Sequence, residues 1–192
     1  MIFTPTRLAG AFIVDLEKRE DERGFFARTF TREVFAERGL WADPIEESVA
    51  YNHRGGTVRG MHFQFPPFAE SKYVRCSRGS LLDVVVDLRP ESTTYLAHVA
   101  VELSDASGRG LYCPPRFAHG YQTLTDATEV SYVMAHPYAP DAQGGLPYDD
   151  PRLGIDWPLP VSIISERDRA HPPLAQVEVE LRRRMGLEDP PA

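Results

Sequence analysis

The chain has 192 residues, of which 42% are apolar and 26% are charged. These fractions are close to those of folded globular proteins, and they exclude a wholly disordered chain and a membrane bundle. The 28 acidic residues outnumber the 21 basic ones and give a net charge of -7, the wrong sign for a protein that coats a nucleic acid. We therefore expect no nucleic-acid partner.

No stretch reaches the roughly 20 apolar residues that a membrane-spanning helix needs. The first residues, MIFTPTRLAGAF, lack the basic, apolar and small-residue order of a signal peptide. We expect a cytoplasmic protein without membrane attachment. The two cysteines, Cys76 and Cys113, have no C-x-x-C spacing, and we expect both to be reduced.

Helices are expected to be short and peripheral. Thr31 can cap a segment that runs to Arg38 and is closed by Gly39. Near the C-terminus, Ser165 and Asp168 have the spacing of a capping box, which opens a helical segment over about 165–186.

Between these helices the sequence alternates with a period of two, which is typical of strands. The clearest runs are 82–88, 96–103 and 128–138. Short strands without helical crossovers predict an antiparallel sandwich or barrel. We expect one all-β domain over residues 1–192, with a barrel core at about 46–140.

Two histidine-bearing segments have a spacing that resembles the metal-binding motifs of cupin barrels. The first reads Gly56-TVRGM-His62-Phe-Gln64, and the second reads Pro114-Pro-Arg-Phe-Ala-His119. Lys72 stands where the cupin pattern has an acid. An amide and an ammonium are poor partners for two histidines around a cation, so we expect no catalytic metal.

The same side chains suit proton transfer next to a carbonyl. Histidine accepts a proton near neutral pH, and a lysine in the same cavity can stabilise an oxyanion. Strand alternation places Tyr132 and Tyr138 on the face of Val130, so that a phenol could face the base across the cavity.

Each candidate also has a structural interpretation. A strand histidine such as His62 is usually an ordinary hydrogen-bonded residue, and an alternating aromatic such as Tyr132 usually fills a barrel. Asp168 can serve only as the acid of a capping box, Lys72 can be solvated, and Arg23 can pair with acids in its own turn. These patterns alone leave a small all-β barrel that could be an enzyme.

Longer motifs carry a more specific resemblance. The string Gly56-TVRGMHFQFPP, followed by Glu70-Ser-Lys72-Tyr-Val-Arg75, resembles the R-G-L-H-x-Q-x-P-P and K-x-V-R core of the dTDP-4-dehydrorhamnose 3,5-epimerase family. The other matching motifs occur in the order of the family, from about residue 1 to 175. They are Asp21-Glu-Arg-Gly-Phe-Phe26, Asp83-Val-Val-Val-Asp-Leu-Arg89, Phe117-Ala-His-Gly120, Tyr138-Ala-Pro140 and Asp149-Asp-Pro-Arg-Leu-Gly-Ile-Asp-Trp-Pro158.

This resemblance implies an all-β, cupin-like double-stranded β-helix (jelly roll) with short peripheral helices. It implies a homodimer, in which the strand around Ile13-Val14 pairs with the partner's sheet, and it implies no metal and no organic cofactor. The implied substrate is a nucleotide-linked, dTDP in the family, 4-keto-6-deoxyhexose of deoxysugar biosynthesis. The protons next to its C4 ketone are removed and returned from the opposite face.

The implied catalytic roles follow position by position. His62 resembles the base, Asp168 the carboxylate that orients it, Tyr132 the acid that returns the proton, and Lys72 the group that stabilises the enolate. The residues implied to bind the substrate are Arg23, Phe26, Arg28, Arg59, Gln64, His119, Tyr138, Gln143 and Arg167.

Departures from the family concern the nucleotide side of the site. Arg28 and Gln143 stand where the family usually has Glu, and Glu47-Ser-Val49 stands in place of Q-x-N. The sequence leaves open the nucleotide base, the exact sugar, and whether C3, C5 or both are inverted. The alternatives are a mono-epimerase or ketoisomerase of another nucleotide sugar, a catalytically silent sugar-binding cupin, and a metal-dependent cupin oxygenase.

Overall fold

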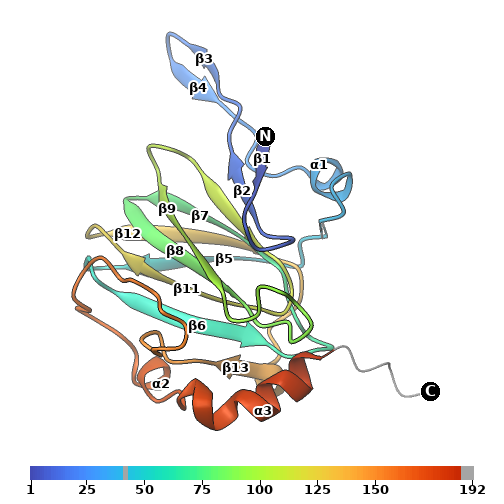
Figure 1. The fold of residues 1–192 in the computed structure, drawn as a ribbon. Coiled ribbons are helices and arrows are strands. Elements are labelled where there is room, and N and C mark those ends of the chain that lie inside the picture. Colours follow the sequence, from blue (N-terminus) through green and yellow to red (C-terminus); the bar gives the residue numbers. More distant parts are fainter. Residues whose placement is uncertain (41–42, 187–192) are drawn as a thin grey trace.

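The structure is a computed structural model that describes residues 1–40 and 43–186. In that part of the chain, two antiparallel sheets form the body of the molecule and short helices lie at its periphery (Figure 1). Residues 41–42 and 187–192 of the predicted domain lie outside the described ranges.

The first sheet has six strands within the described ranges, all paired antiparallel. In spatial order they are β1 (Ile2–Pro5), β2 (Phe12–Asp15), β10 (Gly110–Cys113), β7 (Lys72–Arg78), β12 (Thr128–Met134) and β5 (Glu46–Asn52).

The second sheet has five strands in the same part of the chain, and these are also antiparallel. In spatial order they are β13 (Gln143–Gly145), β6 (Val58–Gln64), β11 (Phe117–Thr123), β8 (Ser80–Asp87) and β9 (His98–Ser104). Two sheets of antiparallel strands form the predicted sandwich or barrel arrangement.

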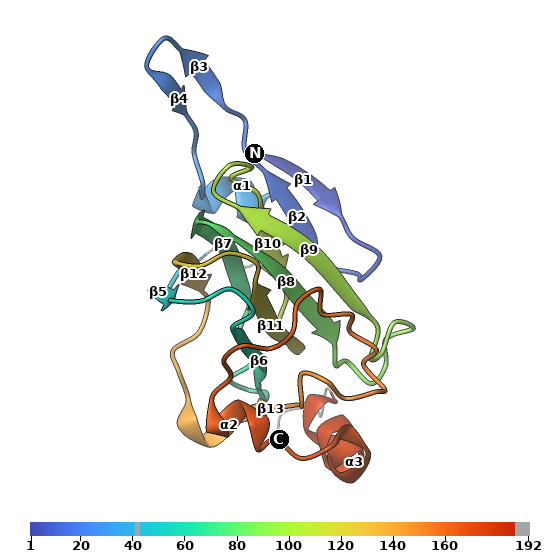
Figure 2. The ribbon, with the colours of Figure 1, turned by 90° about the vertical axis from the view of Figure 1, so that its left-hand side faces the viewer.

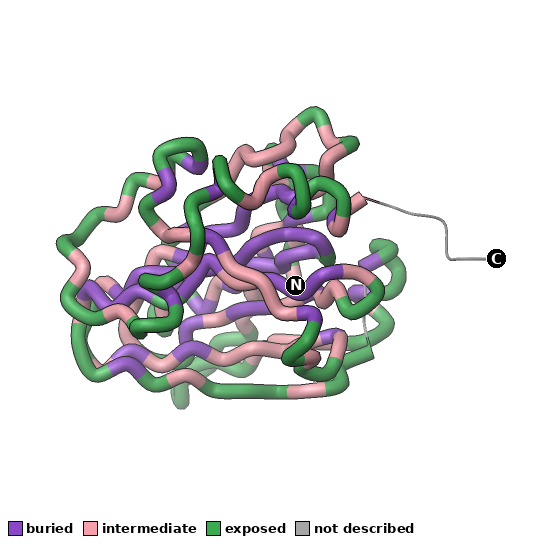
Figure 3. The backbone as a smooth tube through the Cα atoms, turned by 90° about the horizontal axis from the view of Figure 1, so that it is seen from below, coloured by how far each residue is buried: buried purple, intermediate pink, exposed green. Residues whose placement is uncertain are grey.

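Alternation along each strand decides which side chains enter the space between the sheets. On β7, Val74 and Cys76 belong to the interior cluster, whereas Tyr73 packs outward against Phe35 of α1 (Arg32–Ala36). Buried stretches run along the central strands, and exposed ones gather on the loops (Figure 3). Side chains at positions 72, 74 and 76 therefore share the interior face.

The outer face of the second sheet is covered by the C-terminal helix. Met61 and Phe63 on β6 belong to the same apolar cluster as Leu174 and Leu181 of α3 (Leu174–Met185). Figure 2 shows α3 on the β6 and β13 side of the molecule. With Met61 and Phe63 facing outward, the alternating residues at 60, 62 and 64 face the interior.

The predicted N-terminal helix is present as α1, but the Thr31 side chain makes no capping hydrogen bond. The predicted C-terminal cap is half formed: Ser165 Oγ accepts a hydrogen bond of 3.0 Å from the backbone N–H of Asp168 at the start of α2 (Glu166–Arg169). The Asp168 carboxylate is directed elsewhere, as described below. A short 3-10 helix, η1 (Pro140–Ala142), precedes β13.

Two expectations about strands are wrong. The run predicted over 128–138 ends at Met134, because Pro137 has no N–H for a ladder, and Tyr138 lies outside the strand. The residues around Ile13 and Val14 form β2, whose two edges are already paired with β1 and β10 of the same chain, so that strand has no free edge for a partner.

A separate hairpin leaves the body of the molecule. It consists of β3 (Arg19–Asp21) and β4 (Gly24–Phe26), which pair only with each other and project away from both sheets (Figures 1 and 2). Gly24, with φ of +123°, permits its turn.

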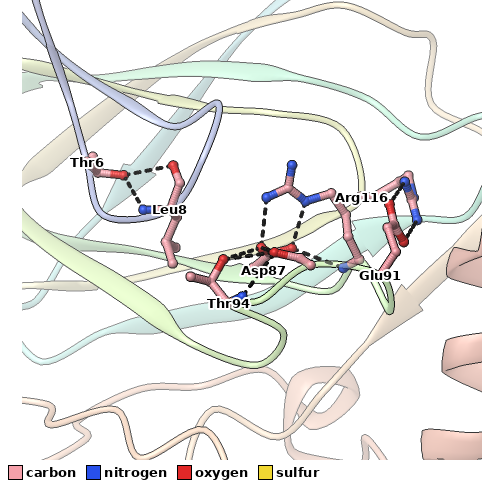
Figure 4. Close-up of polar contacts among 8 residues, drawn as sticks. Thr6, Leu8, Asp87, Glu91, Thr94 and Arg116 are labelled. Carbon is pink, nitrogen blue, oxygen red and sulfur yellow. Dashed lines mark hydrogen bonds and ion pairs between the residues drawn. The ribbon is translucent and has the colours of Figure 1, made fainter.

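The loop after β8 is held by a polar network (Figure 4). The Asp87 carboxylate accepts hydrogen bonds from Arg89, Ser92 and Thr94, and Arg116 forms a two-point ion pair with Glu91 at 2.7 Å. These contacts fix one end of the barrel.

Among the described residues, no helix combines the length and the apolar character that a membrane span requires.

Candidate active site

The centre of the site is a histidine–carboxylate pair that joins β6 to α2. His62 Nε2 lies 2.8 Å from Oδ1 of Asp168, and the backbone N–H of Gly60 donates to Oδ2 of the same carboxylate at 3.1 Å. The helix cap at Ser165 fixes the backbone that carries Asp168. The predicted pairing of His62 with Asp168 is therefore present, although the two residues are 106 positions apart.

The Asp168 carboxylate is held in its ionised form. Burial alone would raise its pKa, but the hydrogen bonds from His62 and Gly60 and the attraction of the imidazole outweigh burial and lower the pKa from 3.8 to about 2. An ionised carboxylate accepts hydrogen bonds only, so the His62 nitrogen that faces it carries the proton. The lone pair of neutral His62 is thereby placed on Nδ1, and the side chain remains 31% exposed.

A second histidine–carboxylate pair lies beside the first. His119 on β11 is the cross-strand partner of His62, and its Nε2 lies 2.7 Å from Asp83 on the neighbouring strand β8. Both side chains of this second pair are buried, at 5% and 0% exposure. His119 therefore reaches the interior with its ring orientation fixed.

Tyr132 faces these histidines from the opposite sheet. It lies on β12, with its ring centre 6.0 Å from that of His119 in an edge-to-face arrangement. Burial of the phenol and the neighbouring Tyr121 hydroxyl raise its pKa well above 10. Tyr132 is therefore a neutral proton donor at any ordinary pH.

A chain of polar contacts leads from this phenol to the rim of the barrel. Tyr121 donates to Asn52 Oδ1 at 3.2 Å, and Arg59 Nε donates to the same oxygen at 2.9 Å. Asn52 thus orients Arg59, whose guanidinium is exposed next to the strand that carries Glu47-Ser-Val49. A cation at this rim is suited to an anionic group of a ligand.

Lys72 lies at the start of β7 and is not solvated. Its ammonium is 2.9 Å from Glu70, and both side chains are mostly buried, at 12% and 10% exposure. Gln64 is also enclosed: its amide donates to the carbonyls of Phe68 and Pro137 and accepts from the N–H of Ala139. Because Gln64 is occupied and Lys72 is cationic, the cupin metal positions form a poor cation site here.

Three of the predicted binding residues form one cluster at the mouth. Gln143 on β13 accepts hydrogen bonds from Tyr138 at 2.8 Å and from Arg167. Tyr138 reaches this place from the loop after β12, with 54% of its surface exposed.

Three predicted binding residues are not brought to this site within the chain. Arg23, Phe26 and Arg28 belong to the projecting hairpin or to the segment after it, and all are exposed. Arg23 pairs with Asp21 of its own turn at 2.6 Å and is 85% exposed, as its structural interpretation anticipated.

Sequence reasoning missed several residues that organise the site. Asp83, Glu70, Asn52 and Tyr121 each bind or orient a predicted residue, but only the first two lie within the quoted family motifs. Glu70 is only two positions from its partner Lys72, whereas the partners of Asp83, Asn52 and Tyr121 depend on which strands are neighbours, which no local spacing reveals. His171, next to His62, also had no motif to mark it.

Comparison with known proteins decides the family. The sequence model described as dTDP-4-dehydrorhamnose 3,5-epimerase matches residues 5–176. The chain belongs to the dTDP-4-dehydrorhamnose 3,5-epimerase family. A relative of that name in Methanothermobacter thermautotrophicus is 42% identical over 182 residues, covering 93% of this chain and 97% of the relative.

Solved structures agree with this assignment. A dTDP-6-deoxy-D-glucose-3,5-epimerase from Legionella pneumophila, crystallised with dTDP-4-keto-L-rhamnose, superposes with a TM-score of 0.87 at 30% identity and covers 94% of this chain and 96% of that chain. A 3'-monoepimerase from Streptomyces bikiniensis, in complex with dTDP-quinovose, gives a TM-score of 0.85 at 31% identity, with coverages of 93% and 90%. The fold is the predicted cupin-like jelly roll, and the protein is a sugar epimerase, an isomerase.

Proposed function

We propose that this chain epimerises C3, C5 or both of a dTDP-linked 4-keto-6-deoxyhexose by proton transfer through an enolate, without a cofactor. The observation that carries the proposal is the ionised Asp168 at 2.8 Å from His62, which leaves a histidine lone pair directed away from the carboxylate. The relatives that bind dTDP sugars support the substrate class.

The proposed reaction conserves atoms and electrons. His62 Nδ1 takes the proton from the carbon next to the C4 ketone, and the electron pair of that C–H bond moves to the C4 oxygen as an enolate. Asp168 stabilises the imidazolium that forms. Tyr132 donates its phenolic proton to the other face of the same carbon, the carbonyl re-forms, and the configuration is inverted. Water then takes the proton from the His62 imidazolium and returns one to the Tyr132 phenolate, which restores both groups.

The positions of Lys72 and Tyr132 support these roles. Lys72 is a mostly buried cation on an interior strand face, and its proposed role is to stabilise the enolate oxygen. The attraction between an ammonium and a developing oxyanion is stronger there than in water. Tyr132 lies on the opposite sheet from His62, and its raised pKa keeps the proton on the phenol until a carbanion or enolate needs it.

The remaining predicted residues form the binding side of the proposal. Arg59 would hold the diphosphate from within the chain, and the 5% of the His119 side chain that is exposed would contact the neighbouring polar groups. Tyr138, Gln143 and Arg167 would line the sugar side, while Gln64 holds the loops around them.

A homodimer would supply the residues that one chain keeps distant. Phe25 and Phe26 are 53% and 63% exposed on the projecting hairpin, and a cleft of about 400 Å³ at its base is lined by Lys18, Arg19 and Arg28. We propose that the hairpin reaches the substrate of the partner subunit with Arg23, Phe26 and Arg28. The single-domain organisation and the cytoplasmic location stay predictions from the sequence.

The direct test is incubation with dTDP-4-keto-6-deoxyglucose in heavy water, followed by NMR of the product. Deuterium should enter at C3, C5 or both, and His62→Ala should abolish that entry. No exchange with this sugar or with its UDP, GDP and CDP counterparts would overturn the proposal, as would undiminished exchange in His62→Ala. Binding without exchange would identify a catalytically silent sugar-binding barrel.

The similarity to a 3'-monoepimerase favours one second candidate, which is inversion at C3 alone. The same spectra distinguish the two, because a mono-epimerase yields product inverted at a single carbon. A Tyr132→Phe variant should lose product formation more strongly than deuterium entry at the first carbon, since the phenol acts after proton removal.

The dimer has its own test. Light scattering at micromolar concentration should report twice the mass of one chain. Arg23→Ala should raise KM about tenfold with little change in melting temperature, because an exposed ion pair contributes little to stability. A monomer with unchanged KM in Arg23→Ala would contradict the proposed role of the hairpin.

A further inference from the structure

His171 has no role in the reaction proposed above, yet it lies against the catalytic pair. Its ring centre is 6.1 Å from that of His62, with the rings at 73° to each other. Its Nε2 is buried, and among the described residues this atom has no hydrogen-bond partner. A buried ring nitrogen without a partner costs free energy, which a ligand at that atom would recover.

The backbone leaves space for this histidine. Gly145 on β13 is the cross-strand partner of His62. A Cβ at position 145 would lie 2.2 Å from the His171 ring, so any side chain there would displace the ring. The glycine thus seats a second imidazole directly beside the first.

Together with Asp168 these histidines form a compact set of donors. One ring nitrogen of His62, one of His171 and one Asp168 oxygen all lie within 4.8 Å of one another. Donor atoms that bind one zinc ion at donor–zinc distances of about 2.0–2.2 Å are roughly 3–3.5 Å from one another. Side-chain rotations that move the donor atoms by about 1 Å would therefore close the set around an ion. Two imidazoles and one carboxylate favour Zn²⁺ and similar divalent transition metals, whereas Mg²⁺ and Ca²⁺ favour sites made of oxygen ligands.

The surrounding charges permit a cation at this place. Asp168 supplies a full negative charge, and its second oxygen is held by the Gly60 N–H. Arg167 is the nearby charge that opposes a cation, and its guanidinium is directed to the Gln143 side chain. The Asp168 charge therefore favours a cation here, and Arg167 is the group that weakens its binding.

We propose that His62, Asp168 and His171 form a binding site for a divalent transition cation such as Zn²⁺, and that its occupancy switches off the base. A cation on His62 Nε2 replaces the proton of that nitrogen, and the ring proton then lies on Nδ1. Nδ1 is the nitrogen that would accept the substrate proton, and once protonated it has no free lone pair to do so. The binding stands without the proposed function, whereas the inhibition rests on it.

The binding test is calorimetric titration of the full chain, freed of metal by chelation, with Zn²⁺ in a non-coordinating buffer. One equivalent per chain should bind to the wild type. His171→Ala and His171→Gln should each weaken binding at least about tenfold, because loss of a direct ligand costs no less than loss of an outer one. His53→Ala, which removes an exposed histidine outside the set, should leave the affinity unchanged.

A Gly145→Ala variant separates geometry from composition. All three donors remain in the chain, but the new methyl group displaces the His171 ring, and Zn²⁺ affinity should fall as in His171→Ala. Thermal unfolding in the presence of chelator verifies that each variant is folded. No stoichiometric binding to the wild type, or equal binding to folded His171→Ala and His171→Gln, would overturn the site.

The inhibition test uses deuterium entry as its readout. Zn²⁺ should suppress exchange in the wild type with a midpoint near its calorimetric Kd, and the midpoint should rise at least about tenfold in His171→Ala. Stoichiometric binding without suppression would retain the site and reject the switch. Absence of exchange even in metal-free enzyme would instead count against the proposed function.

Discussion

The two histidine–aspartate pairs of this barrel have nearly the same geometry and opposite surroundings. The His62–Asp168 pair is 2.8 Å long, and its histidine is 31% exposed. The His119–Asp83 pair is 2.7 Å long and is almost fully enclosed, with its histidine 5% exposed. The first pair joins a strand to a distant helix, whereas the second joins two neighbouring strands. A hydrogen bond to a carboxylate therefore does not by itself mark a base.

Access separates the two roles. A proton can be taken from a ligand only by a nitrogen that the ligand can reach, and His62 is the one of the two histidines whose surface is partly open. The enclosed pair contributes a fixed wall, with His119 packed edge-to-face against Tyr132. The same substitution in each pair should consequently have different effects.

The largest effect is expected for Asp168→Asn. An amide can donate to His62 Nε2, which moves the ring proton to Nδ1 and removes the basic lone pair. Deuterium entry should fall about 10³-fold or more, as expected when a general base has the wrong tautomer. The rate of exchange measured by NMR checks this expectation.

The matched control for that variant is Glu166→Gln, which changes an exposed acid on the same short helix. Its exchange rate should stay within about twofold of the wild type, since surface substitutions away from the chemistry have small effects. Exchange in Asp168→Asn at the rate of the control would show that the carboxylate does not set the tautomer of His62.

A smaller effect, on stability rather than chemistry, is expected for Asp83→Asn. Asp83 Oδ2 is buried and has no partner in the described part of the chain, so the new amide group would place two unsatisfied donors there. The free energy of unfolding should fall by about 1–3 kcal/mol. Urea denaturation measures this change.

The Asp83→Asn variant should also lose less activity: the factor by which its deuterium entry falls should be at least about ten times smaller than the factor for Asp168→Asn. Glu102→Gln, an exposed acid on the next strand, is the control for stability. A loss of exchange equal to that of Asp168→Asn, with unchanged stability, would reverse the roles assigned to the two pairs.

Much of the interior wall could be predicted from the sequence, because strand alternation has a fixed period. Positions 62, 72 and 132 face inward by parity with known core neighbours. The prediction failed at 135–138, where the alternating sequence pattern continues past the end of β12 at Met134. The pattern takes no account of Pro137, which has no N–H to donate to a neighbouring strand.

The pairs themselves were beyond local pattern. His62 and Asp168 were joined only by family resemblance, and Asp83 was not assigned to His119 because strand order, not spacing, makes them neighbours. The direction of the β3–β4 hairpin is likewise set by chain connections that carry no periodic signal.

The smallest expected effect concerns the contribution of the His62–Asp168 pair to acid stability. The pKa of Asp168 is lowered from 3.8 to about 2 in the folded chain, so its ionisation stabilises the fold above pH 4, and this contribution is lost as the pH falls toward 2. The stability difference between wild type and Asp168→Asn should therefore shrink by about 1 kcal/mol between pH 5 and pH 3. Urea denaturation of both proteins at the two pH values measures it. A difference that stays constant or grows on acidification would mean that the carboxylate is not held ionised beside His62, and the tautomer on which the base depends would lose its physical cause.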